Sequence, residues 1–298
     1  MPLTGPVGVV GLGAMGSAIA SRLVTAGVTV IGYDRSSAAW SRLAGAGVDR
    51  ASDLEALSRA CPVILTVVDS DASLAEIVGV IRAQRRDGTV MAMGTHAPRT
   101  CRELAAAAAG SGITFLDAPV SGGRERALRG ELTIMGSGDL AAWQALAPVI
   151  ELLAARLFYL GSVGNAEGAK LINNLLTSIN LLGVAEGVAL AEHLGLDLSE
   201  LSPVIMASSG ASRRFEETLA RVLAGDDMSG TRAGLKVLDK DLSLALDSAP
   251  DGQELALTGL TRALIRRAMD DGLADRDIEI VVPWMRARLT SSSEPDGQ

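Results

Sequence analysis

A glycine-rich turn between two β-rich runs is the feature of this sequence that most constrains its fold. The stretch 7–34 reads VGVVGLGAMG, then an apolar-periodic run, then VTVIGYD. Gly11 suits a tight turn, Gly13 lets the backbone approach a pyrophosphate, and Gly16 lets a helix pack closely on the preceding strand. The amides and positive dipole end of that helix then face the phosphates. Asp34 ends the second run, where a ribose 2′-hydroxyl would be bound, so the stretch predicts a dinucleotide-binding unit.

The residues around this turn are the predicted cofactor contacts. A bare G-x-G-x-x-G arises by chance in flexible turns, but here the strand, the helix, the second strand and the terminal acid are all present. The acid favours NAD. NADP stays open, because Arg35 and the serines at 36 and 37 could pair with a 2′-phosphate. The predicted contacts in this unit are Gly11, Leu12, Gly13, Ala14, Met15, Gly16, Asp34 and Arg35.

Length and composition limit the classes of protein that this chain can be. A chain of 298 residues predicts two domains, at roughly 150 residues for each. Hydrophobic residues make up 48%, which excludes a disordered chain. A net charge of −8 argues against nucleic acid or an anionic membrane as partner, and 3% aromatics leave no set for stacking bases.

The two cysteines, Cys61 and Cys101, cannot build a disulfide framework and indicate a reducing compartment. No signal peptide is evident, because the apolar start lacks a basic region. The run 171–191 is apolar, but three asparagines and Glu186 interrupt it, which favours a buried helix over a membrane span. These features predict a cytoplasmic protein.

Strand and helix patterns alternate in the first half of the chain, which is typical of a mostly parallel sheet with helices on both faces. The sequence therefore predicts an α/β fold: a Rossmann-type domain over 1–163, an all-helical domain over 164–290 joined by a long helix, and a disordered tail over 291–298. The expected strands are 6–10, 28–33, 62–67, 89–93, 113–116, 132–135 and 156–160. The expected helices are 14–26, 37–45, 71–84, 98–110, 139–153, 165–194, 199–208, 231–248, 253–270 and 276–289.

The residues that follow the expected strands are candidate ligand contacts, because ligands on such a sheet bind at the carboxyl ends of its strands. Asp34, Val68, Thr95 and Ser121 each follow one, so we expect them to share an edge. The segment 117–123, DAPVSGG, brings a serine and two glycines there, and its amides suit an anion such as a carboxylate. An ordinary loop is the alternative interpretation of that segment.

Two lysines in expected helices are candidate catalytic or binding groups. Lys170 and Asn174 are four residues apart and share one face of an otherwise apolar helix. Burial of a lysine favours its neutral form, which can accept a proton. The alternative is a lysine whose charged head reaches solvent. Lys240 lies in KVLDKDL, where a solvated charged face is the alternative.

Other common kinds of catalytic site find no support in the sequence. His96 and His193 have no partner at metal-ligand spacing, and H-E-x-x-H and paired-cysteine motifs are missing, so we expect no metal site. The G-x-S-x-G elbow of a serine hydrolase is missing too.

Four segments together resemble the β-hydroxyacid dehydrogenase family, over about residues 7–289. They are GLGAMG at 11–16, DAPVSGG at 117–123, GNAEGAKLINN at 164–174 and KDL at 240–242. That family includes 3-hydroxyisobutyrate, threonate and tartronate semialdehyde enzymes. The resemblance implies an oxidoreductase that transfers hydride between a small 3-hydroxy acid, or its oxo form, and a nicotinamide cofactor.

The resemblance also implies roles for individual residues. Lys170 would be the catalytic acid and base. Val68 and Asp69 would lie in a second cofactor loop, and Thr95 would contact the nicotinamide ribose. Lys240 would reach both cofactor and substrate from the helical domain. The implied substrate contacts are Ser121, Gly122, Gly123, Asn174 and Lys240.

The chain departs from the family pattern in places that leave the substrate open. RER stands at 124–126, where small residues are common, and His96 and Ala97 replace residues that are usually apolar and hydroxyl-bearing. Asn173 stands where 6-phosphogluconate dehydrogenases have a histidine. Lys170 argues against imine reductases, which lack this lysine.

The pair Arg124 and Arg126 has two interpretations. The guanidinium groups could form a second anion site for a carboxylate, phosphonate or sulfonate near the mouth of the pocket. Alternatively, both point to solvent and pair with Glu125 or Glu131.

A competing hypothesis for the whole chain is a catalytically inactive cofactor-binding protein that acts through protein contacts. Members of the family are usually dimers or tetramers, so the resemblance implies a homodimer or homotetramer through the helical domain. We expect a small hydroxy acid as substrate, and neither nucleic acid nor membrane as partner.

Overall fold

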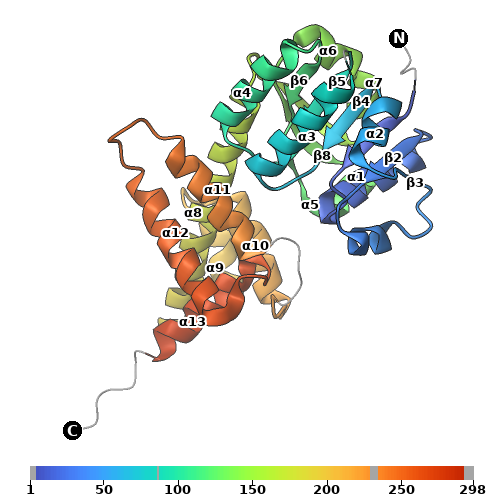
Figure 1. Cartoon of the computed structure of the whole chain (residues 1–298). Helices are drawn as coiled ribbons and strands as arrows, with labels where there is room; N and C mark the ends of the chain where they lie inside the picture. Colours follow the sequence, from blue (N-terminus) through green and yellow to red (C-terminus); the bar gives the residue numbers. More distant parts are fainter. Residues whose placement is uncertain (1–4, 86, 229–233, 292–298) are drawn as a thin grey trace. The chain divides into compact units, whose positions relative to one another are not determined.

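A six-stranded parallel sheet forms the centre of the first part of the chain (Figure 1). The computed structural model describes residues 5–85, 87–228 and 234–291. The strands are β1 (Val7–Val10), β2 (Val30–Tyr33), β3 (Asp49–Arg50), β4 (Val63–Thr66), β5 (Thr89–Ala92) and β6 (Thr114–Asp117). Their order is β3-β2-β1-β4-β5-β6, with every pairing parallel. The order reverses between β1 and β4, which is where open parallel sheets bind ligands. The predicted α/β class is confirmed.

A second, three-stranded sheet holds β7 (Val120–Ser121), β8 (Leu132–Gly136) and β9 (Ala154–Tyr159). β7 runs antiparallel to β8, and β8 runs parallel to β9. Ser121 therefore lies within β7, opposite Thr133, and does not simply follow a strand of the main sheet. The sequence analysis missed this strand: the chain enters a second sheet after β6, so Ser121 reaches its place through β7 and not directly from the main sheet.

Helices cover both faces of the main sheet. One layer contains α1 (Ala14–Thr25), α5 (Gly123–Arg129), α6 (Leu140–Ala145) and α7 (Ala147–Ile150), and the other contains α2 (Leu54–Ala60), α3 (Asp71–Gln84) and α4 (Pro98–Ala109). Side chains of β1 point alternately to the two faces of the sheet: Val7 and Val9 pack against the layer of α1, and Val10 packs against the layer of α2 and α3. Both layers are needed because a parallel sheet is buried on both faces.

Several short elements differ from the sequence-based expectation. The segment after β2 is a 3₁₀ helix, η1 (Ser37–Leu43), rather than an α-helix. The helix expected over 139–153 is two helices, and Pro148 lies in the first turn of the second, where a proline is tolerated. β3, β7, α2 and α5 were missed because they have only two to seven residues, too few to show a period.

The two cysteines are free thiols buried in the core under α2, α3 and α4. Burial raises the pKa of the Cys61 thiol to about 11, although nearby Arg85 lowers it. Burial likewise raises the pKa of Cys101, and the neighbouring carboxylates of Glu167 and Asp117 add to the effect. Both thiols are therefore protonated and unreactive near neutral pH.

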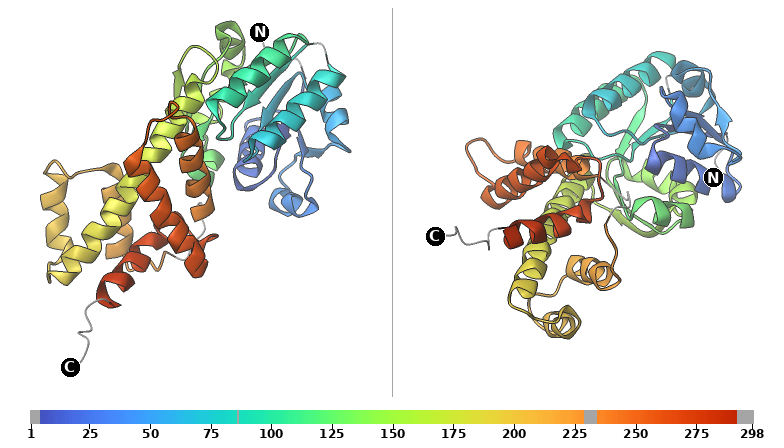
Figure 2. Two further views of the ribbon diagram at one scale, coloured as in Figure 1. Left: turned by 60° about the vertical axis from the view of Figure 1, so that its left-hand side comes forward. Right: turned by 90° about the horizontal axis from the view of Figure 1, so that it is seen from below.

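A second compact unit is helical, and the division between the units falls between Lys170 and Leu171, inside α8 (Asn165–His193). Its other helices are α9 (Leu198–Met206), α10 (Arg213–Leu223), α11 (Leu235–Asp247), α12 (Ala256–Ala268) and α13 (Val281–Ser291), with a π turn, η2 (Met269–Leu273), and a 3₁₀ turn, η3 (Ile278–Ile280). Figure 2 shows α11 and α12 alongside α8. Their contact is apolar, through side chains such as Leu181, Leu238 and Ile265.

The helical unit also departs from expectation at its edges. α10 was missed, although Ser212 caps it by accepting from the Phe215 amide at 3.0 Å. The helix expected from residue 231 begins at Leu235, and residues 229–233 lie outside the described residues. The tail expected over 291–298 also lies outside them from residue 292 onward.

One helix in the described part of the chain, α8, is long and apolar enough to cross a membrane by length and composition. In its most apolar window 44% of the residues are buried within the structure. The core helix of a globular protein has the same properties, and Leu181, Ala185 and Val188 of α8 are core residues of the helical unit.

Candidate active site

The glycine turn between β1 and α1 requires glycine at two positions. Gly11 has φ 91°, and a Cβ there would lie 2.3 Å from the carbonyl oxygen of Val67. A Cβ at Gly16 would lie 1.8 Å from the carbonyl oxygen of Gly11. Gly13, in contrast, faces open space, and no side chain caps α1 there. The turn is therefore closed against β4 and open at the start of α1, an arrangement that fits a dinucleotide pyrophosphate.

Asp34 is fixed at the end of β2 by two backbone amides. Its Oδ2 accepts from the Leu12 amide at 2.7 Å, and its Oδ1 accepts from the Ser36 amide at 2.7 Å. The carboxylate is thus attached directly to the glycine turn. Arg35 points elsewhere: its Nη1 lies 3.3 Å from Glu76 Oε2 on α3, and its side chain is 69% exposed.

Two further loops lie at the same edge of the main sheet, because they follow the neighbouring parallel strands β4 and β5. Val68 is half-buried and Asp69 is exposed in the loop between β4 and α3. Thr95 is half-buried between β5 and α4. The sheet therefore places Asp34, Val68 and Thr95 at one edge, as expected.

The carboxylate of Asp117, at the end of β6, caps the helix that carries Lys170. Asp117 is fully buried and accepts from Ser137 Oγ at 2.6 Å, the Gly164 amide at 3.0 Å and the Glu167 amide at 3.2 Å. Ser137 Oγ in turn accepts from the Ala166 amide at 3.1 Å. Sequence reasoning placed Asp117 in an anion-binding loop and missed this capping role.

Lys170 is the sixth residue of α8, and only 8% of its surface is exposed to solvent. Most charged side chains are not buried without a structural or functional partner. Lys170 does engage in polar interactions within the protein, so it is not an isolated charge. Asn174 follows it by one turn of the same helix.

In the helical unit, Asp241 joins two of the predicted substrate contacts. Its Oδ2 accepts from Asn174 Nδ2 at 2.5 Å, and its Oδ1 lies 3.0 Å from Lys240 Nζ. Asp241 is only 2% exposed. It stands inside the KDL segment, but nothing in a linear pattern shows that it faces an asparagine 67 positions earlier.

A buried histidine was also missed as part of this region. His96, beside Thr95, is fully buried, and its Nδ1 lies 3.0 Å from Asp71 Oδ1. Its backbone amide donates to Glu167 Oε2 at 3.1 Å. The sequence signal was the replacement of a usually apolar residue by histidine.

The two arginines both lie in α5, directly after β7, but they differ in their surroundings. Gly122 and Gly123 have φ values of 137° and 74° and lead into α5. Arg124 Nη1 lies 3.2 Å from Glu125 Oε1, which matches the solvent-facing interpretation for this residue. Arg126 is half-buried, and its Cβ and Cδ would each lie 3.2 Å from a Cβ at Gly122.

Two further features of the described residues concern metal binding and cavities. Residues 5–85, 87–228 and 234–291 contain no group of three or more histidine, cysteine or acidic side chains that could hold a metal.

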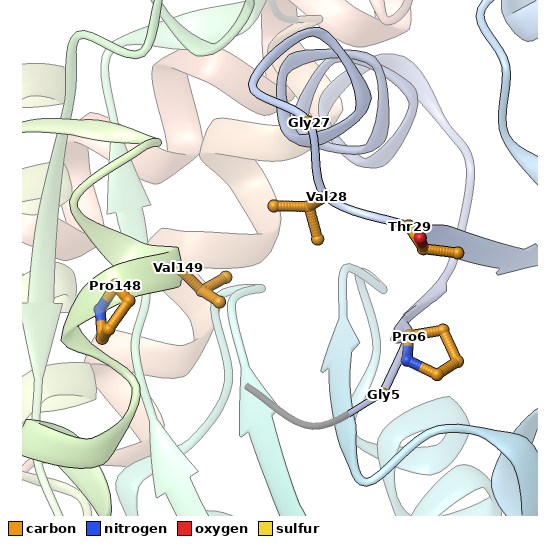
Figure 3. A pocket seen from close by; sticks show the side chains of 7 residues that line it. All are labelled: Gly5, Pro6, Gly27, Val28, Thr29, Pro148 and Val149. Atoms are coloured by element: carbon orange, nitrogen blue, oxygen red, sulfur yellow. The ribbon is translucent and has the colours of Figure 1, made fainter. Parts of the chain in front are cut away.

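A hollow of about 510 Å³ lies at the opposite end of the sheet from the glycine turn, between the starts of β1 and β2 and helix α7 (Figure 3). Its lining residues are Gly5, Pro6, Gly27, Val28, Thr29, Pro148 and Val149, and Figure 3 shows that they bring mainly small or apolar groups into it.

Comparison with known proteins gives matches over both units. A family model described as the NAD binding domain of 6-phosphogluconate dehydrogenase matches residues 6–161. A second, described as NAD-binding of NADP-dependent 3-hydroxyisobutyrate dehydrogenase, matches residues 164–285.

Individual relatives match over nearly their whole length. L-threonate dehydrogenase of Cupriavidus necator is 34% identical, covering 93% of this chain and 94% of that protein. 2-(Hydroxymethyl)glutarate dehydrogenase of Eubacterium barkeri is 29% identical, covering 98% of each. The solved structure of Mycobacterium tuberculosis 3-hydroxyisobutyrate dehydrogenase with L-serine is 27% identical. It superimposes with a TM-score of 0.88, covering 95% of this chain and all of that one.

The cap of α8 can be tested by Ser137→Ala. The substitution removes the acceptor of the Ala166 amide and one donor to Asp117, both in a buried place. Loss of a cap and of a buried hydrogen bond should lower the free energy of unfolding by roughly 1–2 kcal/mol. Urea unfolding measures this change. Ser162→Ala, at an exposed serine just before α8, is the control, and equal unfolding midpoints for the two variants would contradict the capping role.

Proposed function

The chain belongs to the β-hydroxyacid dehydrogenase family, and we propose that it interconverts a small 3-hydroxy acid and its oxo or semialdehyde form, with Lys170 as general acid and base. It is an NAD(P)-dependent oxidoreductase that acts on the CH–OH group of a hydroxy acid. The observation that carries the role of Lys170 is its near-complete burial on α8, just after the capped start of that helix.

The cofactor would accept or supply the hydride, and the protein's groups would handle the proton and hold the substrate. In oxidation, neutral Lys170 would accept the proton of the substrate hydroxyl while a hydride leaves the carbon that bears this hydroxyl. In reduction, the protonated lysine would return it. Ser121, Gly122 and Gly123 would anchor the substrate carboxylate, and Asn174 would bind a substrate oxygen. Lys240 of α11 would contact the substrate and the cofactor, and the neighbouring Asp241 carboxylate restrains its side chain.

Lys170→Ala is expected to reduce kcat by at least about 10²-fold, the usual contribution of a positioned acid or base. Binding of NADH should be nearly unchanged. The assay follows absorbance at 340 nm with a panel of monoanionic and dianionic 3-hydroxy acids, because the substrate itself is still to be identified. Lys236→Ala, at an exposed lysine of α11, is the matched control. Turnover of Lys170→Ala within threefold of the parent would remove this lysine from the chemistry.

We further expect NAD⁺ to be preferred over NADP⁺ by at least tenfold in kcat/KM. The Asp34 carboxylate, held by the glycine turn, accepts a hydrogen bond from a ribose 2′-hydroxyl and repels a 2′-phosphate. Glu76 of α3 pairs with Arg35 and would compete with that phosphate for its guanidinium group. Glu76→Gln should therefore lower the ratio of kcat/KM with NAD⁺ to kcat/KM with NADP⁺. The control Glu103→Gln, at another exposed ion-paired glutamate, should leave this ratio unchanged. A higher kcat/KM with NADP⁺ for the parent would overturn this assignment.

A homodimer or homotetramer through the helical unit is also part of the proposal. Large apolar side chains are exposed there: Leu257 and Leu260 of α12 are 57% and 59% exposed, and Ile172 of α8 is 61% exposed. Leu257 and Leu260 are three residues apart on α12 and so share one face, and contiguous exposed apolar surface marks interaction sites. Sedimentation should show an oligomer that Leu257→Glu/Leu260→Glu weakens. Phe158→Glu, at an exposed apolar residue of β9, should not weaken it, and a monomeric parent would refute the proposal.

We keep the cytoplasm as the proposed location. The two buried, unpaired thiols fit a reducing compartment.

A further inference from the structure

The two loops assigned to the cofactor are bridged by a buried pair of side chains, His96 and Asp71. We propose that this pair is a positioning device that holds the two loops in the arrangement that binds the cofactor. The inference rests on the proposed function, because the assignment of Val68, Asp69 and Thr95 to the cofactor belongs to it. His96 directly follows Thr95, and Asp71 follows the loop of Val68 and Asp69 as the first residue of α3.

Asp71 takes the place of a missing helix cap. Ala97, at the start of α4, has no side chain that can cap the helix. Asp71 reaches across from α3 and accepts from the Ala97 amide at 3.3 and 3.4 Å, from Thr100 Oγ1 at 2.6 Å and from His96 Nδ1. The start of α4 and the start of α3 are thus held by one carboxylate.

Asp71 is ionised at neutral pH, which strengthens its contact with the histidine. Burial raises the pKa of Asp71, but the hydrogen bonds from His96, Thr100 and the Ala97 amide outweigh it and hold the pKa below 3.8. A charged acceptor makes each of these hydrogen bonds stronger than a neutral one. Since Asp71 can only accept, His96 donates through Nδ1.

The imidazole of His96 packs tightly under the turn that precedes Thr95. A Cβ at Gly94 would lie 2.6 Å from His96 Nε2 and 2.1 Å from the carbonyl oxygen of Val68. Position 94 therefore requires glycine, because the His96 imidazole and the Val68 carbonyl oxygen leave no room for a side chain where the two loops meet. His96 Nε2 has no hydrogen-bond partner in the described part of the chain. An imidazole protonated on Nδ1 alone leaves Nε2 as an acceptor and leaves no N–H unsatisfied.

The backbone of the same residue reaches the lysine helix. The His96 amide donates to Glu167 Oε2 at 3.1 Å, and Glu167 lies three residues before Lys170 on α8. Residues three apart on a helix are neighbours on its surface. The side chain of His96 thus fixes one cofactor loop to the other, and its amide fixes Thr95 relative to the turn of Lys170.

The competing explanation is that His96 only fills the core, as an apolar residue would. The two explanations predict different effects of removing the Nδ1 donor while keeping the volume. His96→Leu removes the donor, His96→Asn keeps a donor close to the Nδ1 position, and Asp71→Asn removes the charge that accepts. His193→Leu, at the other and exposed histidine of the chain, is the matched control.

The experiment is a calorimetric titration of the full-length variants with NADH, or with NADPH if the parent prefers it. We expect His96→Leu and Asp71→Asn each to raise the Kd at least tenfold, the scale of one hydrogen bond to a charged group. The double variant should raise it no more than either single change. His96→Asn should stay within threefold of the parent. With saturating cofactor, kcat of His96→Leu should also stay within threefold, because Lys170 is intact.

Other outcomes overturn the inference. An unchanged Kd in folded His96→Leu would show that the residue only fills the core, as would a lower unfolding temperature without a change in Kd. Equal losses in His96→Leu and His96→Asn would exclude the Nδ1 donor as the cause. If His96→Leu does not fold, Asp71→Asn decides, and an unchanged Kd there overturns the inference. A parent that binds NADH but turns over no hydroxy acid would count against the proposed function alone, whereas one that binds neither NADH nor NADPH would overturn both.

Discussion

The buried carboxylate of Asp117 is the interaction on which the placement of Lys170 depends. It ends β6, and its three donors come from Ser137 after β8 and from the backbone at the start of α8. A buried carboxylate left without donors would cost several kcal/mol, so these elements cannot shift apart cheaply. The sheet thereby sets where α8 begins, and the helix period then sets where Lys170 lies.

The same device recurs along the edge of the sheet. Asp34, at the end of β2, accepts from the amide of Leu12 in the glycine turn, and Asp71, at the start of α3, accepts from the amide of Ala97 at the start of α4. Each carboxylate thus joins two elements that are far apart in the sequence. Backbone amides at helix starts carry no partner within their own helix, and a carboxylate from a neighbouring loop satisfies them. Loops that would otherwise be mobile become fixed, which a site that orients two reactants requires.

The sequence predicted what is fixed locally and missed what is fixed at a distance. Gly16 was recognisable because a steric contact within one strand–turn–helix unit, with the carbonyl oxygen of Gly11, demands glycine there. Gly11 was recognisable because the tight turn of that unit gives it a positive φ of 91°. The burial of Lys170 could be expected because this lysine interrupts an apolar helical period. His96 and Asp71 are 25 positions apart, and Asn174 and Asp241 are 67 apart. No period or spacing relates such pairs, because the fold brings them together.

The hydrogen bond between Asn174 and Asp241 limits what this asparagine can offer a substrate. A side-chain amide has two N–H donors and one carbonyl oxygen. One N–H goes to Asp241, and the carbonyl oxygen accepts from Asn173 Nδ2 at 3.1 Å. The remaining N–H is a donor, and a donor suits the oxygen of either a hydroxyl or a carbonyl group. Under the proposed function, Asn174 would thus hold the substrate oxygen in both directions of the reaction, while Lys170, one turn earlier, would give or take the proton.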